Sequence, residues 1–142
     1  MAAHGGLLRV STRGDGEIVD LTEGVASVVR ASGVSAGVAV VFGVGSTVAV
    51  TTMEYEPGGV QDLGELLERL VPRERAGGGE YAHNVRNADT NAHAHLRAAV
   101  IGPSVSIPIV DGRLGLGTWQ QVVLVDFDDR PRQRSVSVTV LS

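Results

Sequence analysis

The sequence contains no cysteine, few aromatic residues and no long apolar run. Because cysteine is absent, the chain offers no disulfide and no thiolate ligand, so a bound metal ion would take imidazole, carboxylate or water. No stretch approaches the roughly 20 apolar residues that a membrane helix requires. The first ten residues also lack the charged and apolar regions of a secretory signal. We therefore expect a cytoplasmic protein with no membrane partner.

Basic residues are outnumbered by acidic ones. Twelve Lys and Arg residues stand against 16 Asp and Glu residues, which gives a formal net charge of −4. Because contacts to nucleic-acid phosphates need a basic surface, we expect no nucleic-acid partner. The length of 142 residues and the 43% share of hydrophobic residues suit one globular domain, which we place over residues 1–142.

Hydrophobic periodicity predicts several strands. Valine alternates with Ser or Thr over residues 135–140, as in a strand with one buried face. Asp111-Gly112 lies between two β-branched or apolar runs and is a strong hairpin signal. The expected strands are Leu7–Arg13, Glu17–Asp20, Gly37–Phe42, Ser46–Thr52, Ser104–Val110, Arg113–Leu116, Trp119–Phe127 and Gln133–Leu141.

Three helices are expected between these strands. The first has Thr22 as its cap and ends at Gly33, and the second carries one apolar face over residues 60–70. The third follows Asn91 and ends at Gly102. The glycine-rich, polar stretch from Arg73 to Asn91 has little periodicity and is expected to form a long loop. Together these elements predict a single-domain α+β fold.

Three of the four histidines, His83, His93 and His95, lie close together in the sequence. Neutral imidazole is a common metal ligand, so this cluster is a candidate metal site. On a regular helix, however, residues i and i+2 point about 200° apart, so His93 and His95 reach one ion only if the first turn is irregular. The alternative is a set of histidines that form hydrogen bonds or line an interface.

Other polar residues are candidates for binding or catalysis. Glu54 and Glu56 flank a strand end, where Glu54 could act as a general acid or base; the alternative is that both are solvated. Arg97 and Arg113 could bind a phosphate group.

Three further residues are candidate ligand-binding side chains. Ser46 and Thr47 follow a glycine-rich turn that offers backbone N–H groups and hydroxyls, and Gln120 is placed with them. The turn does not have the spacing of a nucleotide-binding P-loop.

Long segments of the sequence resemble one protein family. STVAVTTMEYEPGGVQDL, NAHAHLRAAVIGPS and DGRLGLGTWQQ are similar to segments of the YjbQ family, sometimes labelled secondary thiamine-phosphate synthases, over a region from about Ser11 to the C-terminus. The resemblance implies an α+β fold with two β-sheets and packed helices, assembled as a homotrimer with polar pockets near the subunit interfaces. It also implies a divalent metal, zinc first, and weak formation of thiamine phosphate from hydroxymethylpyrimidine pyrophosphate and a thiazole phosphate.

The resemblance assigns the histidines individually. His83 matches the histidine after the family's Tyr-x, and His95 matches that of its Ala-His-Leu segment. Gly45 stands where many members have a histidine, and His93, which one branch of the family shares, is the expected replacement ligand. For His93 and His95 to face one metal ion, the helix must begin near His93, with Asn91 or Ala92 outside it.

The resulting hypothesis is a histidine-lined site for a phosphorylated heterocycle. His83, His93 and His95 would hold the metal. The chain has no dense acidic cluster of the kind that holds a magnesium–pyrophosphate complex, which fits a weak activity. The alternative is a non-catalytic trimeric protein that binds a metabolite or a metal.

Overall fold

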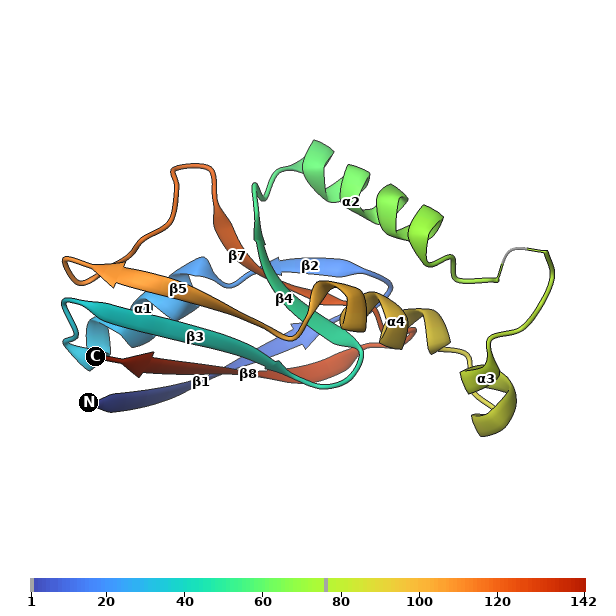
Figure 1. Ribbon diagram of the computed structural model, residues 1–142, viewed down its shortest axis with the longest axis horizontal. Helices are drawn as coiled ribbons and strands as arrows, with labels where there is room; N and C mark the ends of the chain where they lie inside the picture. The colour runs from blue at the N-terminus through green and yellow to red at the C-terminus, as the bar shows by residue number, and fades with distance from the viewer. Residues whose placement is uncertain (1, 76) are drawn as a thin grey trace.

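The computed structural model describes residues 2–75 and 77–142, and its fold is α+β (Figure 1). Two antiparallel sheets carry the strands in the orders β1-β8-β3-β5-β6 and β2-β7-β4. The strands are β1 (Ala3–Thr12), β2 (Glu17–Asp20), β3 (Gly37–Val44), β4 (Val48–Met53), β5 (Ser104–Val110), β6 (Arg113–Leu114), β7 (Gln121–Asp126) and β8 (Arg132–Leu141). The helices of the described residues are α1 (Thr22–Ser32), α2 (Pro57–Leu70), α3 (Ala82–Asn87) and α4 (Ala92–Ile101).

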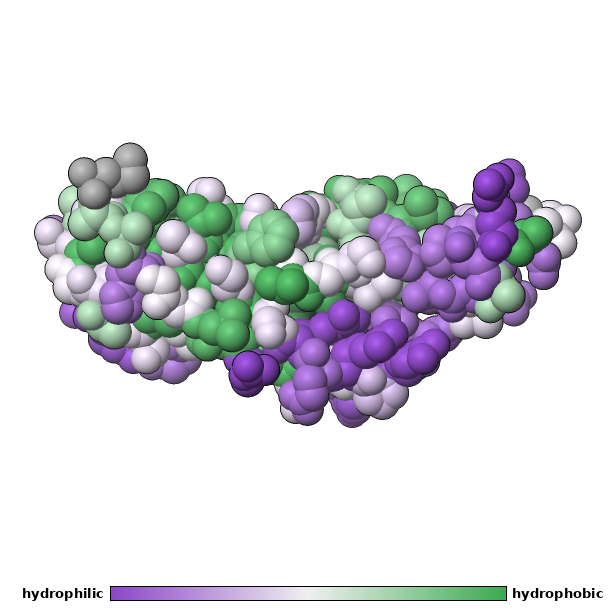
Figure 2. Space-filling model, turned by 90° about the horizontal axis from the view of Figure 1, so that it is seen from below, coloured by the Kyte–Doolittle hydropathy of each residue, from purple (hydrophilic) through white to green (hydrophobic). Residues whose placement is uncertain are grey.

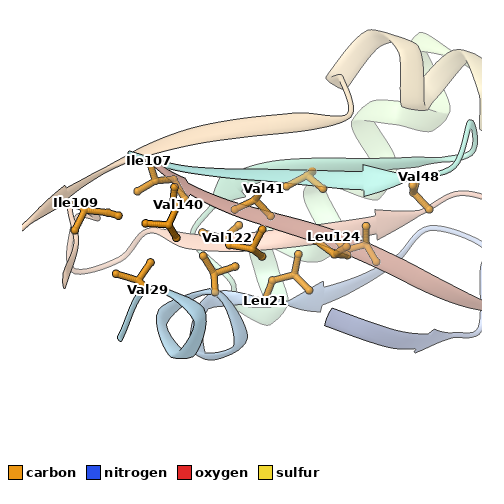
Figure 3. Packing of buried hydrophobic residues seen from close by; sticks show 14 residues of the cluster. Leu21, Val29, Val41, Val48, Ile107, Ile109, Val122, Leu124 and Val140 are labelled. Carbon is orange, nitrogen blue, oxygen red and sulfur yellow. The ribbon is translucent and has the colours of Figure 1, made fainter. Parts of the chain in front are cut away.

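The larger core lies between the two sheets and α1. Val29 on α1 packs with Val122 and Leu124 on β7 and with Val41 and Val140 of the five-stranded sheet (Figure 3). These strands bury alternate side chains, because successive residues of a strand point to opposite faces. The valine alternation in β8 is therefore the direct signature of this core.

A second core covers the other face of the three-stranded sheet. Val123 and Val125 of β7 pack there with Leu67 of α2 and with Ala94 and Ala98 of α4. Since both faces of β7 are covered, this strand is apolar at nearly every position, which is typical of a central buried strand. Alanine on α4 lets that helix approach the sheet closely.

Three details differ from the sequence-based expectations. The expected loop from Arg73 to Asn91 contains helix α3, which buries no residue and so leaves no apolar period in the sequence. The strand expected from Trp119 begins at Gln121, and Trp119 lies in the preceding turn with 73% of its surface exposed. Thr22 is the first residue of α1 rather than its cap, and its hydroxyl accepts a hydrogen bond from the Val122 N–H.

The outer face of the five-stranded sheet carries no charged residue on β3 or β5. Phe42, Val44 and Val110 are exposed there, and Phe42 lies beside Ser104 and Ser137 of the neighbouring strands. Helix α1 packs on the opposite face, and no helix of the described residues covers the outer one. The part of the sheet surface formed by β3 and β5 is therefore uncharged and partly apolar.

The two ends of the molecule differ in polarity. The termini, α1 and the turn between β5 and β6 lie at one end, and α3 lies at the other (Figure 1). Figure 2 shows hydrophilic residues gathered at the α3 end, while apolar and neutral residues dominate the opposite half of the same face. No helix of the described residues is long and apolar enough to cross a membrane.

Candidate functional site

The three clustered histidines come from α3 and the first turn of α4. The rings of His83 and His95 lie against each other, with centroids 4.6 Å apart and planes tilted by 43°. Asn84 joins the two helices, because its side-chain oxygen accepts a hydrogen bond from the Ala92 N–H at 3.0 Å. This contact fixes the start of α4, and it leaves Asn91 outside the helix as expected.

His93 is the most enclosed of the three, with 2% of its surface exposed. Its Nδ1 makes no hydrogen bond to any described residue, and the side-chain oxygen of Asn91 is equally buried and unpartnered. Burial lowers the pKa of His93, and the positive charges of Arg97 and Arg73 lower it further. The ring is therefore neutral at pH 7. An unpaired buried polar atom costs about 1–3 kcal/mol, so these two atoms favour a polar partner that is not part of the chain.

The predicted three-histidine metal site does not form in a single chain. Both His93 and His95 lie within the helical residues of α4, so their side chains diverge, and His95 packs on His83 instead. Among residues 2–75 and 77–142, no three His, Asp or Glu side chains are placed to hold one ion. The described residues of one chain therefore supply no three-ligand set for zinc, and the role of His93 in place of the imidazole missing at Gly45 stays a prediction.

A buried ionic network lies next to the start of α4. Arg134 donates to Asp126 at 2.7 Å and to the Thr47 hydroxyl at 2.7 Å, and Asp128 accepts from Thr47 at 3.3 Å. Burial raises the pKa of Asp128. Hydrogen bonds from the Asp129 N–H and from the Arg132 and Asn91 side chains lower this pKa, as does the positive charge of Arg132, and the net shift is downward. The network thus links both sheets to Asn91.

Thr47 and Ser46 have different surroundings. Thr47 is buried, and its hydroxyl is committed to this network. Ser46 is exposed on the turn between β3 and β4. The expectation that both hydroxyls bind a ligand therefore stays a prediction only for Ser46; Thr47 belongs to the internal network.

Arg97 holds the end of α2 against α4. Its Nε donates to the Val71 carbonyl at 2.9 Å, and its Nη2 donates to Glu68 at 2.5 Å. Burial raises the pKa of Glu68, but the Arg73 N–H and the Arg97 side chain lower it, so the pair is ionised. The guanidinium is near enough to His93 to lower its pKa, although two of its donors are already used.

A polar hollow with a volume of 580 Å³ lies before and beside α3. Arg73, Arg75, Tyr81, Asn84 and Thr90 are among the residues that line it. Asn84 belongs to both features, because its side-chain oxygen also lies 3.4 Å from His83 Nδ1. Sequence reasoning missed Asn84, Asn91 and Arg73, and only the position of Asn91 before the helix marked one of them.

The remaining candidate residues lie away from the histidines. Glu54 is exposed just beyond the far end of β4, about 20 Å along an extended strand from Thr47. Gln120 is tied to Thr52 and to the Gly117 N–H, and Arg113 lies on β6. A single chain therefore does not bring Glu54, Arg113 and Gln120 to the histidine cluster.

The fold and this polar end define the protein as a two-sheet α+β domain with a buried histidine at a helix start. The chain belongs to the YjbQ family: the family model described as "UPF0047 protein YjbQ-like" matches residues 7–142. The family and the fold expected from the resemblance are therefore confirmed, and the matched region begins slightly before Ser11.

Curated relatives and solved structures agree with this assignment. The chain is 37% identical over 124 residues to a UPF0047 protein of Methanothermobacter thermautotrophicus, covering 87% of this chain and 82% of the relative. It is 38% identical over 125 residues to one of Archaeoglobus fulgidus, covering 88% and 91%. A YjbQ-like protein of unknown function from Sulfolobus solfataricus has a TM-score of 0.87 at 29% identity, with 99% of each chain covered. A hypothetical protein of Aeropyrum pernix has a TM-score of 0.86 at 36% identity, with 97% and 98% covered.

Proposed function

We propose that the α3–α4 end of the molecule binds a phosphorylated heterocyclic small molecule. The observation that carries this proposal is the buried, unpartnered Nδ1 of His93 beside the unpartnered oxygen of Asn91. Buried polar atoms in folded proteins normally have hydrogen-bond partners, so a ligand or an ordered water is the expected occupant. The polar hollow next to Asn84 has the volume of an ordinary small-molecule site.

Side chains in and near the hollow offer contacts to a planar ligand that carries a phosphate group. The adjacent rings of His83 and His95 offer an aromatic surface on which a heterocycle can stack. Arg73 and Arg75 line the hollow together with Glu74, Glu80 and Asp89, and the two arginines would supply the contacts to the phosphate group. We assign no metal ion to the site, because no three His, Asp or Glu side chains among the described residues of one chain are placed to hold one.

The reaction implied by the family resemblance is weak formation of thiamine phosphate. A C–N bond forms between the thiazole nitrogen and the pyrimidine methylene carbon, while the C–O bond to pyrophosphate breaks. Pyrophosphate leaves with its charge, so arginines that neutralise this charge and hold both substrates in place would supply the rate acceleration.

A non-catalytic binding role is the second candidate. It is favoured by the position of Glu54, which lies far from the histidines and so supplies no acid or base to them within one chain. It is also favoured by Arg97, whose donors to Val71 and Glu68 give it a structural role.

The test is calorimetric binding of the thiazole phosphate and of thiamine phosphate, together with turnover of the two precursors. Wild-type protein and His93→Gln and Asn91→Ala variants would be compared, with His4→Gln, an exposed change on β1, as the control. If the His93→Gln and Asn91→Ala variants lose binding while the His4→Gln variant keeps it, the proposed site is supported. Turnover then distinguishes the enzyme from the binding protein, and absence of binding to the wild type would overturn both.

We also propose that the protein is a homotrimer. The part of the outer sheet face formed by β3 and β5 supports this, because it carries no charged residue and exposes Phe42, Val44 and Val110, and such a surface is suited to contact with another copy.

A further inference from the structure

The side-chain amide of Asn91 has a fixed orientation at the start of α4. Its oxygen is buried and has no hydrogen-bond partner among the described residues, whereas the same side chain donates a hydrogen bond to Asp128. An amide donates only from its nitrogen and accepts only at its oxygen, so the nitrogen faces Asp128 and the oxygen faces away from it. The residue that accepts from the nitrogen therefore decides which atom Asn91 presents to the proposed site.

Asp128 can act only as an acceptor toward Asn91. Its Oδ1 accepts from the Asp129 N–H at 2.8 Å, and its Oδ2 accepts from Arg132 Nε at 3.1 Å. Burial raises the pKa of Asp128, but the hydrogen bonds that it accepts and the Arg132 charge lower it overall, so the group is ionised at pH 7. If Asn91 turned its oxygen toward this carboxylate, two buried acceptors would face each other without a proton between them.

Asn84 is held in the opposite sense. Its oxygen accepts from the Ala92 N–H at 3.0 Å, and a backbone N–H can only donate, so the nitrogen of Asn84 is the atom left for a ligand. Asn84 also lines the hollow beside α3. The two amides next to Ala92 thus offer one acceptor, from Asn91, and one donor, from Asn84. The neutral ring of His93 can donate or accept at Nδ1, depending on its tautomer, and so imposes no pattern of its own.

We propose that Asp128, acting through Asn91, makes the site selective for a heterocycle that carries an N–H donor such as an exocyclic amino group. The amino group donates to the Asn91 oxygen, whereas a carbonyl group in its place would bring a second acceptor against that oxygen. A ring nitrogen of the same ligand can accept from Asn84. Asp128 is a positioning residue in this role, because its contact is with Asn91. The inference rests on the proposed function and specifies the ligand chemistry of the same site.

The first experiment compares two ligands on the wild-type protein. Thiamine phosphate carries a 4-amino group on its pyrimidine ring, and its 4-oxo analogue carries a carbonyl oxygen there. We expect calorimetry to give a roughly ten- to hundredfold higher affinity for the amino compound, because the oxo compound leaves the buried Asn91 oxygen without a donor. Equal affinities would overturn this inference and leave the proposed function standing. Binding of neither compound would overturn the proposed function, and this inference with it.

The second experiment changes the positioning residue. In Asp128→Asn the new side chain can donate as well as accept, so Asn91 can turn and present its nitrogen. We expect the ratio of the two affinities to fall toward one or to reverse, whereas a general loss of structure would weaken both ligands alike. Asp129→Asn is the matched control, because it removes the same charge from the next residue, which accepts from the Thr90 hydroxyl. If both variants keep the wild-type ratio, Asp128 does not select the ligand.

An NMR measurement on the ligand-free wild-type protein tests the orientation even if Asp128→Asn does not fold. The side-chain amide signals of Asn91 are identified by their absence from the spectrum of Asn91→Ala. A hydrogen bond to a buried carboxylate should shift one of the two amide protons downfield and slow its exchange with water. If both protons exchange as fast as those of an exposed asparagine, the contact with Asp128 is absent and the inference is wrong.

Discussion

His93 combines near-complete burial with a titratable ring. Its pKa is lowered by burial and by Arg97 and Arg73, so the folded protein binds its proton less readily than the unfolded chain does. Stability from this effect is fully present above the ordinary histidine pKa of about 6.5 and is lost as the pH falls below it through the lowered pKa of the folded state. The unfolding free energy should therefore decrease on acidification, with a slope of up to about 1.4 kcal/mol per pH unit from this residue.

Urea denaturation at several pH values, on protein dialysed against a chelator, measures this slope. His93→Gln should flatten the decrease between about pH 7 and pH 5. His4→Gln, which alters an exposed histidine on β1, should keep the wild-type slope. If the two variants show the same pH dependence, then His93 is not the group responsible.

Gly45 has a backbone that only glycine adopts readily. Its φ is +147°, and a Cβ atom there would lie 3.0 Å from Arg134 Nη1. Gly45→His would therefore strain the backbone and press on the buried network, and should lower the unfolding free energy by about 1–3 kcal/mol. We also expect it not to create a tight zinc site, because Arg134 occupies the adjacent space.

Thermal denaturation and zinc titration would test the effect of this change. Gly16→Ala is the matched control, since Gly16 also has a positive φ but no atom lies within 4 Å of its added Cβ. A larger loss at Gly45 than at Gly16 separates crowding by Arg134 from backbone strain alone. High-affinity zinc binding by Gly45→His would contradict the structural interpretation of Arg134.

At the scale of the elements, α2 and α4 are joined by Arg97. The side chain is mostly buried and binds both the Val71 carbonyl and Glu68. Arg97→Lys retains the charge but cannot make both contacts in this geometry, so we expect a loss of about 1–3 kcal/mol in the free energy of unfolding.

A double-mutant cycle with Glu68→Gln measures the coupling between the two side chains. If Arg97 acts mainly on a phosphate ligand, Arg97→Lys should instead keep its stability and lose only ligand affinity. The cycle thus distinguishes the structural role seen here from the role expected from sequence.

The elements differ in how well their sequence predicts them. Strand β8 buries one face, and helix α2 packs Val60, Leu63 and Leu67 on the sheet, so the periodicity of both is visible in the sequence. Helix α3 buries no residue and leaves no such pattern. The proximity of His83 and His95 could be predicted because the two residues lie close together in the sequence. The separation of Glu54 from them could not, because it depends on the direction of β4, which is set by tertiary packing.

For the whole molecule, the outer sheet face predicts self-association. Light scattering should give a mass of about 44 kDa, three times the chain mass of 14.8 kDa. Phe42→Lys places a charge on this face and should reduce the mass toward that of the monomer. Leu66→Lys on α2 is the control, because Leu66 is 42% exposed and Phe42 is 43% exposed. A monomer mass for the wild-type protein would contradict the trimer.

The pairing of β1 with β8 has a consequence for how the chain folds. Residues 3–12 pair with residues 132–141, so this part of the sheet cannot form before residues 132–141 have left the ribosome. β2 likewise waits for β7, with which it pairs. Long-range antiparallel pairing of this kind is associated with folding on the millisecond-to-second scale. Until β7 and β8 have been synthesised, the apolar residues of β3 and β4 remain without these pairing partners, and the nascent chain is prone to aggregation.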